Sequence, residues 1–276
     1  MSADSRQFYR QMSIGTAKPT PDELAAAPHY FIDSLDVVQD YSVGDFEKDA
    51  LVLLEKLFET SDVVILAGGS GLYHKALCEG LDVFPEVEEK YRQQAEDLFE
   101  KKGLGGLQNT LKDLDYQYFT KVDIHNTQRL KRALSVCFAT GKTFSDFCQK
   151  NTTPRFFNSI LFCVDVPRDI LYQRINERVE VMLKEGLLAE AEKLQPFQNK
   201  NALQTVGYKE LFSFWNGEYP SLDYAIDKIK QHSRNYAKRQ VTWFKNQGDY
   251  KFVSPDDWDG IMAIVKERIN FNNEGN

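Results

Sequence analysis

Apolar residues in this chain gather in a few short runs that are separated by longer amphipathic stretches. Four runs predict β-strands, at residues 29–32, 63–67, 160–166 and 250–253. The second and third largely lack polar alternation, as expected for strands that are buried on both faces. The pattern therefore predicts a sheet covered by helices.

Helical spacing of apolar residues dominates between these runs. From Ser42 to Thr60 the apolar positions repeat with the period of an α-helix, and Ser42 with Asp45 fits a capping box at its start. Strands that alternate with helices favour a parallel sheet, with ligands beyond the carboxyl ends of the strands. We therefore predict an α/β fold.

The middle of the chain breaks this alternation. Residues 86–102 and 126–140 are charged and look helical, and we find no convincing buried strand between Pro85 and Pro154. We expect an α-helical insertion domain at residues 85–155, inside an α/β core formed by residues 1–84 and 156–276.

Composition indicates an ordinary globular protein. Hydrophobic residues make up 42% of the chain and charged residues 27%, and the net charge is −7. No apolar run approaches the roughly 20 residues that span a bilayer, and the four cysteines show no zinc-like spacing. We expect a soluble cytoplasmic protein that uses no membrane.

Two stretches are basic in spite of the acidic total. Residues 228–248 carry six Lys or Arg and no Asp or Glu, and residues 121–155 carry an excess of Lys and Arg over two aspartates. Such surfaces can bind a polyanion at defined places. They can equally be ordinary solvated helix faces, and the pattern alone leaves both interpretations open.

Polar residues begin the chain, where Asp4, Ser5, Arg6 and Gln7 follow Met1 closely. Chain ends usually fray, so this cluster is either a solvated tail or part of a site. A glycine-rich turn, Gly68 to Tyr73, follows the second predicted strand and can let backbone amides approach an anion. Alone, that turn is also explained as a helix start with Ser70 as N-cap.

A second motif, Gly141-Lys142-Thr143, resembles the end of a phosphate-binding loop but follows a predicted helix. The Gly-x-x-x-x-Gly-Lys-Ser/Thr pattern occurs nowhere in the chain, so we interpret Gly141 as a helix C-cap followed by a new helix start.

Several cations have the spacing of ligand-binding groups. Gln128 and Arg132 share a helix face, and Arg174 and Arg178 stand one helical turn apart. The second pair can clamp phosphates or form salt bridges with Glu177 or Glu180. The segment Tyr236 to Phe244 mixes cations with aromatic side chains on a predicted helix.

These segments in this order resemble the tRNA dimethylallyltransferases, and the resemblance spans nearly the whole chain. The motifs that carry it are Asp4-Ser5-Arg6-Gln7, Ile14-Gly15-Thr16-Ala17-Lys18-Pro19, Pro28 to Asp33, Gly68 to Tyr73, Gln128 to Arg132, Gly207-Tyr208 and Lys238 to Trp243.

The resemblance implies transfer of a dimethylallyl group from dimethylallyl diphosphate to N6 of adenosine 37 in tRNA, with Mg²⁺. It implies a core like that of P-loop nucleotide kinases and an insertion that embraces the tRNA anticodon stem-loop. Asp4 would accept the N6 proton, with Ser70 in the reactive region. Arg174 and Arg178 would contact the diphosphate. The tRNA contacts would be Asp4, Ser5, Arg6, Gln7, Gln128, Arg129, Leu130, Lys131, Arg132, Lys238, Arg239 and Gln240.

Family members carry a first strand, a phosphate-binding loop and a helix before the motif that begins at Ser2, and this chain has none of them. We therefore expect neighbouring strands with unpaired edges and weak or absent activity. An intact pocket predicts that residues 4–7 pack near Ser70.

Three alternatives remain open from the sequence: a non-catalytic tRNA-binding module, an adenylate isopentenyltransferase that acts on a free nucleotide, and, ranked last, a small-molecule kinase. We expect a monomer.

Overall fold

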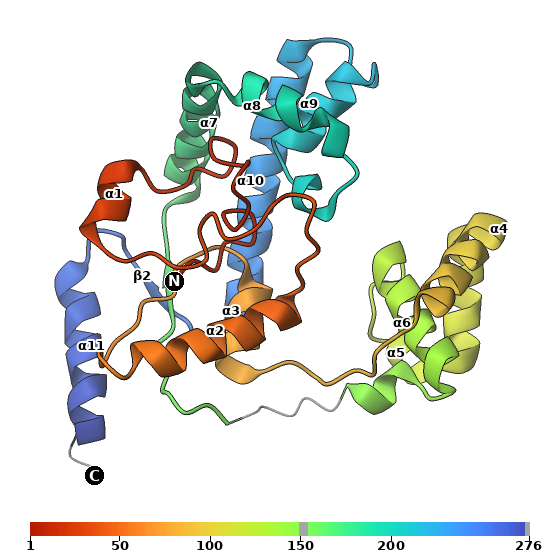
Figure 1. The fold of residues 1–276 in the computed structure, drawn as a ribbon, viewed down its shortest axis with the longest axis horizontal. Helices are drawn as coiled ribbons and strands as arrows, with labels where there is room; N and C mark the ends of the chain where they lie inside the picture. Colours follow the sequence, from red (N-terminus) through yellow and green to blue (C-terminus); the bar gives the residue numbers. More distant parts are fainter. Residues whose placement is uncertain (149–153, 274–276) are drawn as a thin grey trace. The chain divides into compact units, whose positions relative to one another are not determined.

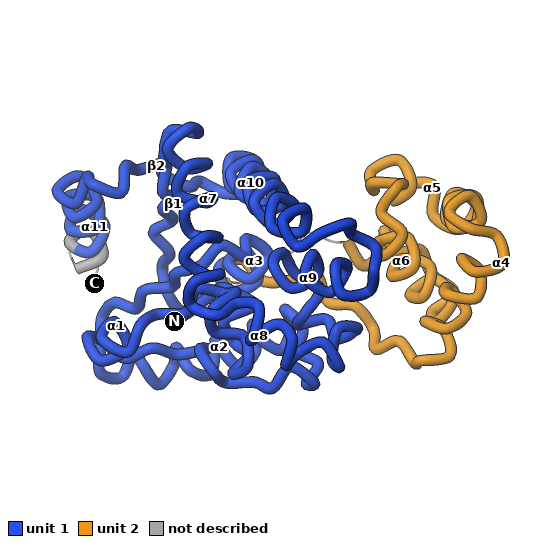
Figure 2. Tube along the Cα trace, turned by 90° about the horizontal axis from the view of Figure 1, so that it is seen from above, with its two compact units in different colours: residues 1–78, 155–276 blue, residues 79–154 orange. Residues whose placement is uncertain are grey.

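The computed structural model describes residues 1–148 and 154–273. The chain forms two compact units (Figure 1), coloured separately in Figure 2. Unit 1 contains the described residues of 1–78 and 155–276, and unit 2 contains those of 79–154. Each unit has its own hydrophobic core.

Unit 1 is built mainly of helices around a small sheet. No helix within the described residues is long and apolar enough to cross a membrane. Its elements in chain order are α1 (Pro21–Ala26), α2 (Val43–Leu57), α3 (Gly71–Glu79), β1 (Phe162–Val164), α7 (Arg168–Glu185), α8 (Leu187–Leu194), the 3-10 turns η2 (Gln195–Phe197) and η3 (Asn201–Leu203), α9 (Tyr208–Trp215), α10 (Leu222–Asn246), β2 (Lys251–Val253) and α11 (Trp258–Asn273).

The sheet pairs two segments that lie far apart in the sequence. Strands β1 and β2 run parallel, with Cys163 opposite Phe252. The ladder continues beyond the strands, because Asp165 N donates to Val253 O at 2.8 Å and Lys251 N donates to Leu161 O at 2.9 Å. The parallel α/β arrangement is confirmed, with the third and fourth predicted strands shortened to three residues each.

The other two predicted strands do not form ladders. Ala67 makes a single parallel bridge, to Ser2, and the side chains of Val63 and Ile65 are 53% and 74% exposed. Residues 29–32 are not a strand, because Phe31 and Asp33 adopt left-handed φ values of 62° and 54°. An apolar run gives β-propensity, but a ladder needs a partner backbone alongside it.

Helix α2 confirms the predicted capping box. The Ser42 side chain accepts from Asp45 N at 3.2 Å, and Asp45 accepts in return from Ser42 N at 2.9 Å. Its buried face presents Phe46, whose ring stacks on Phe8 at 5.7 Å between centroids. This packing anchors the N-terminal segment, since Phe8 is only 1% exposed.

Unit 2 is helical. It contains α4 (Glu89–Leu114), α5 (Tyr116–Phe119), α6 (Thr127–Thr140) and the 3-10 turn η1 (Phe144–Phe147). Gly103, with φ 61°, interrupts α4. Gly141 ends α6 in a left-handed conformation, and Thr143 caps η1 through its side chain. The interpretation of Gly141-Lys142-Thr143 as a C-cap and a new helix start is therefore confirmed.

Arg155 fixes the point at which the chain re-enters unit 1. Its side chain is 7% exposed and ion-pairs with Glu47. The same guanidinium donates to Leu77 O at 2.8 Å and to Ala76 O at 2.6 Å. Arg155 thus belongs to the packing of unit 1, one residue before the boundary expected from the sequence.

Candidate active site

The first residues of the chain are held against the segment that ends at Ala67. Ala3 N donates to Ala67 O at 2.7 Å, and Ala67 N donates to Met1 O at 3.0 Å. The N-terminal ammonium donates to Ile65 O at 2.8 Å. This pairing excludes a solvated tail and carries Asp4 to the glycine-rich turn.

The glycine-rich turn packs directly against that segment. A Cβ at Gly68 would lie 2.4 Å from the carbonyl carbon of Ala3 and 2.5 Å from Asp4 N. Ser70 Oγ accepts from Ser5 N at 3.1 Å and donates to Ser5 Oγ at 3.2 Å. Of residues 4–7, Ser5 is thus the one that contacts Ser70 directly, and α3 begins at the residue after Ser70, as expected.

Asp4 is the carboxylate of this cluster. Its Oδ1 accepts the backbone N–H of Arg6 at 2.9 Å. Burial raises the pKa of Asp4, and this outweighs the opposing effects of the Arg6 N–H and of the positive charges on Arg6 and Arg178. A carboxylate with a raised pKa is a stronger proton acceptor, which suits a general base.

Arg6 and Gln7 are tied to neighbouring loops. Arg6 Nη1 donates to Asn201 O at 2.8 Å. Gln7 Nε2 donates to Thr16 O at 3.3 Å and to Ala17 O at 3.2 Å, so its amide braces the loop that carries the Ile14 to Pro19 motif. Arg6 also lines a cavity described below, whereas Gln7 is engaged within the protein.

One face of α10 covers the glycine-rich turn. Gln240 Nε2 donates to Gly69 O at 2.8 Å, and a Cβ at Gly71 would lie 2.3 Å from the Trp243 ring. The Tyr236 hydroxyl shares hydrogen bonds with the side chains of Gln240 and Ser70. Sequence reasoning did not assign Tyr236 to the site, although the spacing 236, 240, 243 places these three side chains on one helix face.

The remaining α10 candidates face outward. Lys238 and Arg239 are exposed, and the Arg239 guanidinium lies 5.7 Å from the centroid of the Tyr236 ring. Gln240 is instead half-buried against Gly69. The cations are therefore available to a ligand, while Gln240 holds the turn in place.

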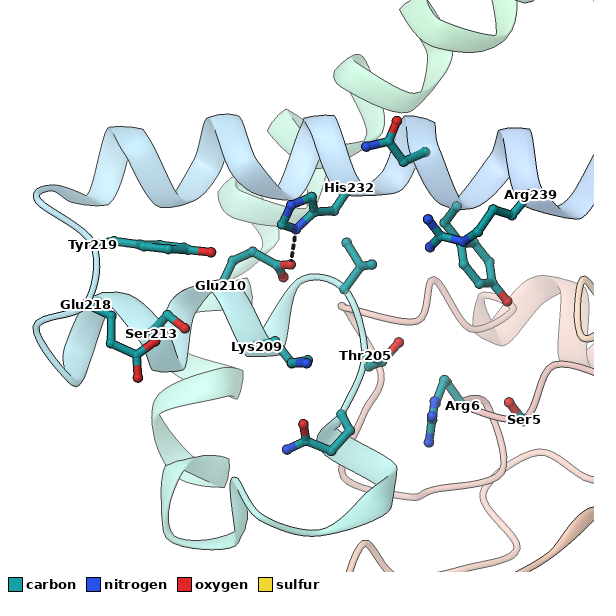
Figure 3. A pocket seen from close by; sticks show the side chains of 14 residues that line it. Ser5, Arg6, Thr205, Lys209, Glu210, Ser213, Glu218, Tyr219, His232 and Arg239 are labelled. Atoms are coloured by element: carbon teal, nitrogen blue, oxygen red, sulfur yellow. Dashed lines mark hydrogen bonds and ion pairs between the residues drawn. The ribbon is translucent and has the colours of Figure 1, made fainter. Parts of the chain in front are cut away.

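A cavity of about 660 Å³ opens beside Ser5 and Arg6 (Figure 3). This volume is within the range of roughly 300–1,000 Å³ that is typical of ligand sites. Side chains from the N-terminal segment, the segment before α9, α9 itself and α10 line it. They are Ser5, Arg6, Gln204, Thr205, Val206, Lys209, Glu210, Ser213, Glu218, Tyr219, His232, Asn235, Tyr236 and Arg239.

Arg174 and Arg178 lie on the exposed side of α7. Neither forms an ion pair within the described part of the chain, because Glu177 accepts from Gln173 and Glu180 pairs with Lys230. Of the two guanidiniums, Arg178 is the one whose charge lowers the pKa of Asp4. The salt-bridge alternative raised by the sequence is therefore not realised.

In unit 2 the predicted tRNA-binding residues differ in how far their side chains are exposed to solvent. Gln128, Arg129 and Arg132 are exposed on α6. Lys131 is held in an ion pair with Glu96 at 2.6 Å, with only 13% of its side chain exposed. Leu130 is fully buried in the core of unit 2, so its side chain has no surface to offer RNA.

The described residues contain no group of three or more His, Cys, Asp or Glu side chains that could hold a metal ion. Asp4 is the carboxylate at the site, with Ser5 and Ser70 hydroxyls beside it. This donor set suits Mg²⁺ only where substrate phosphates and water supply the remaining ligands, as is common for that ion.

Known proteins resemble this chain over nearly its whole length. A family model described as IPP transferase matches residues 7–247. A tRNA dimethylallyltransferase from Flavobacterium psychrophilum is 44% identical over 276 residues, which cover 98% of this chain and 90% of the relative. The enzyme of the same name from Christiangramia forsetii is 45% identical over 271 residues, covering 98% and 89%.

Solved structures of tRNA-modifying transferases are also similar to this chain. A tRNA isopentenylpyrophosphate transferase from Bacillus halodurans superposes with a TM-score of 0.68 at 33% identity, covering 99% of this chain and 88% of that one. A eukaryotic dimethylallyltransferase acting on tRNA gives a TM-score of 0.76 at 24% identity, which bears on the fold alone. The family model and these relatives together show that the chain belongs to the IPP transferase family.

Proposed function

We propose that this chain transfers a dimethylallyl group from dimethylallyl diphosphate to N6 of adenosine 37 in tRNA. The observation that carries the proposal is the part-buried Asp4 carboxylate, which directly precedes Ser5, a residue that contacts Ser70 and lines the cavity, in a chain whose relatives are named tRNA dimethylallyltransferases. The reaction is a substitution at an allylic carbon.

Asp4 acts on the nucleophile. The exocyclic N6 amine is a poor nucleophile because its lone pair conjugates with the ring. As the N6–carbon bond forms and the carbon–oxygen bond to diphosphate breaks, the Asp4 carboxylate accepts a proton from N6. The raised pKa of Asp4 helps it take that proton near neutral pH.

Cations act on the leaving group. Diphosphate gains negative charge as the carbon–oxygen bond breaks, and groups that stabilise this charge act mainly on the transition state. In our proposal Arg178, with Arg174 one helical turn away, supplies the positive charge that stabilises the departing diphosphate. Asp4 and Ser70 are the oxygen donors that would lie beside a Mg²⁺ ion bound with the diphosphate, and the ion would supply positive charge to the leaving group.

The RNA is held by exposed polar groups. The part-buried Ser5 and Arg6 line the cavity and shape the adenine pocket, with Gln7 bracing the loop beside it, and the exposed Lys238 and Arg239 contact the backbone of the anticodon stem-loop. In unit 2, Gln128, Arg129 and Arg132 lie on the exposed side of α6 and contact further phosphates. A loop nucleotide is less costly to extrude than a base-paired one, which suits a substrate adenosine in the anticodon loop.

The alternatives are less well supported. An enzyme for free nucleotides needs no separate helical unit with exposed cations, and both compared relatives carry tRNA in their names. A module that only binds RNA gives no role to the part-buried Asp4 carboxylate with its raised pKa. We therefore retain the transfer reaction as the proposed function.

The test is transfer of radiolabelled dimethylallyl groups to an anticodon stem-loop RNA, with product nucleosides identified after digestion. We expect label at N6 of the loop adenosine. Asp4→Asn removes the proton acceptor at nearly constant shape and should lower the transfer rate by roughly 10²–10⁴-fold with RNA affinity unchanged.

Asp22→Asn provides the matched control, because Asp22 is an exposed carboxylate in the first turn of α1. It should transfer at the parental rate. Equal label incorporation by the Asp4→Asn and parental chains would refute Asp4 as the base, and no incorporation by either would refute the transfer reaction.

A further inference from the structure

A single carboxylate on α8 holds one loop near the start of the chain. Glu190 Oε2 accepts from the backbone N–H groups of Ser13 and Ile14 at 2.9 and 2.8 Å. Its Oε1 accepts from the Gly15 N–H at 2.9 Å and from the Tyr208 hydroxyl at 2.6 Å. An ionised carboxylate only accepts hydrogen bonds and has about four lone-pair positions, so four donors match its capacity.

Tyr208 and Gly15 fit closely together at this carboxylate. Tyr208 is fully buried, and a Cβ at Gly15 would lie 2.5 Å from its hydroxyl oxygen. Burial and the charge of Glu190 raise the pKa of the Tyr208 hydroxyl, so this group stays protonated and donates. The loop is therefore docked on a fixed pair of side chains.

The other end of the same loop holds Gln7. Two carbonyl oxygens of the loop accept from Gln7 Nε2, as described above. Gln7 Oε1 accepts from Ser2 Oγ at 3.1 Å, and Ser2 Oγ accepts in turn from Asp4 N at 3.2 Å. Hydrogen bonds and a short piece of backbone thus connect Glu190 to Asp4.

Resting on the proposed function, we propose that Glu190 is a positioning residue for dimethylallyl transfer, and that it holds Asp4 in place through the loop, Gln7 and Ser2. Glu190 is not among the residues that line the cavity, so it acts on the reaction through the groups that it holds. Misplacement of a reacting group by about 1 Å can cost about a hundredfold in rate.

The test compares the single-turnover transfer rate at saturating anticodon stem-loop RNA with equilibrium binding of the same RNA. Glu190→Gln keeps the shape of the side chain, but its NH₂ group donates, so at least one of the four donors loses its acceptor. We expect the transfer rate to fall roughly 10–100-fold, with RNA affinity unchanged. A folding defect alone would reduce both signals, because less of the protein would be active.

Glu192→Gln is the matched control, because Glu192 is exposed on the same helix. It should transfer at the parental rate. Ser2→Ala is a second variant, which keeps the proposal testable if Glu190→Gln does not fold. It removes the buried hydroxyl between Gln7 and Asp4 and should lower transfer by a similar factor, again with RNA affinity unchanged.

Two further measurements separate a positioning role from a local one. Because both side chains act through one series of contacts, Glu190→Gln with Ser2→Ala should lose little more than the larger single loss, rather than the product of the two. Amide deuterium exchange needs no transfer activity. It should become faster at residues 2–9 in Glu190→Gln, whereas a role confined to the loop would affect residues 13–18 alone.

Parental transfer rates in folded Glu190→Gln or in Ser2→Ala would overturn this inference and leave the proposed function standing. Losses that multiply in the double variant would also overturn it, as would faster exchange confined to residues 13–18. Absence of transfer by the parental chain would instead count against the proposed function itself, and with it the role of Glu190 in that reaction.

Discussion

The Asp4–Gln7 segment and the Gln128–Arg132 segment are both short polar runs, yet they are built differently. In the first, Asp4 accepts the Arg6 N–H and Ser5 meets Ser70, so each polar group has a fixed place. In the second, Arg129 and Arg132 are exposed while Leu130 is buried, as the period of a helix dictates.

Polar residues serve two different purposes in these two segments. Chemistry requires reacting groups to be held in position, because misplacement by about 1 Å can cost about a hundredfold in rate. Attraction of a phosphate backbone depends mainly on the number of cations that reach it. The first segment therefore has the construction of a catalytic site and the second that of an electrostatic surface.

Displacing the Asp4–Gln7 segment should have the strongest consequence for transfer. In Gly68→Ala the new Cβ would overlap backbone atoms of Ala3 and Asp4, which cannot rotate away. We expect transfer to fall by roughly a hundredfold or more, with RNA affinity reduced far less. Single-turnover transfer and equilibrium RNA binding measure the two effects separately.

Gly44→Ala is the control for that substitution, because a Cβ there would meet only Ser42 Oγ, at 3.7 Å. It should leave transfer near the parental rate. If Gly68→Ala transferred equally well, the segment would not be as rigidly placed as the comparison requires.

A smaller effect concerns the pH dependence of transfer. In the proposed reaction the ionised form of Asp4 is the active one, so the rate should fall as pH drops through its raised pKa, about tenfold per unit below it. Arg178→Met removes a positive charge that lowers this pKa, so the acid limb should move to higher pH.

Arg174→Met serves as the paired variant, since Arg174 is not among the charges that act on Asp4. It should lower transfer without moving the acid limb. A pH–rate profile of the chemical step records both changes, and equal displacement of the limb in the two variants would contradict the assignment of Arg178.

The smallest effect is expected in the electrostatic segment. Arg129→Ala with Arg132→Ala should weaken RNA binding several-fold and lower the slope of log affinity against log salt by about 1.4–1.8. The rate of transfer in the saturated complex should not change. Binding titrations at several salt concentrations provide the measurement.

Arg92→Ala in the same unit is the control, because Arg92 is exposed and paired with Glu89 on α4. Its salt slope should equal that of the parent. If the slope of log affinity against log salt were unaltered in the double variant, the electrostatic role of Gln128–Arg132 would be contradicted.

Local features were predictable because they depend on residues three or four positions apart. Ser42 with Asp45 starts α2, and Gly141 ends α6, as their residue types predict. The chemistry offered by Asp4 and the family resemblance were equally readable from order and residue type. The burial of Leu130 was also available from the helical period, although it was missed.

The pairing of β-strands was harder to predict, because an apolar run does not specify which other segment will lie beside it in the sheet. The segment ending at Ala67 has the composition of a buried strand, yet it forms one bridge and leaves Ile65 74% exposed. Residues 29–32 were also assigned a strand, which the left-handed turn at Phe31 prevents.

Residue order alone was enough to predict the α/β class, the helical middle region, the cap that starts α2 and the glycine that ends α6, and the residue types available for catalysis. It did not predict where α2 and α4 end, at Leu57 and Leu114. The packing of distant segments was needed to show that Ser5, next to the part-buried Asp4, contacts Ser70 and that Glu210 contacts His232. The physical reason is distance along the chain. Caps and helical periods act within a few residues, whereas burial and cavities arise when segments 22 or 65 positions apart pack together.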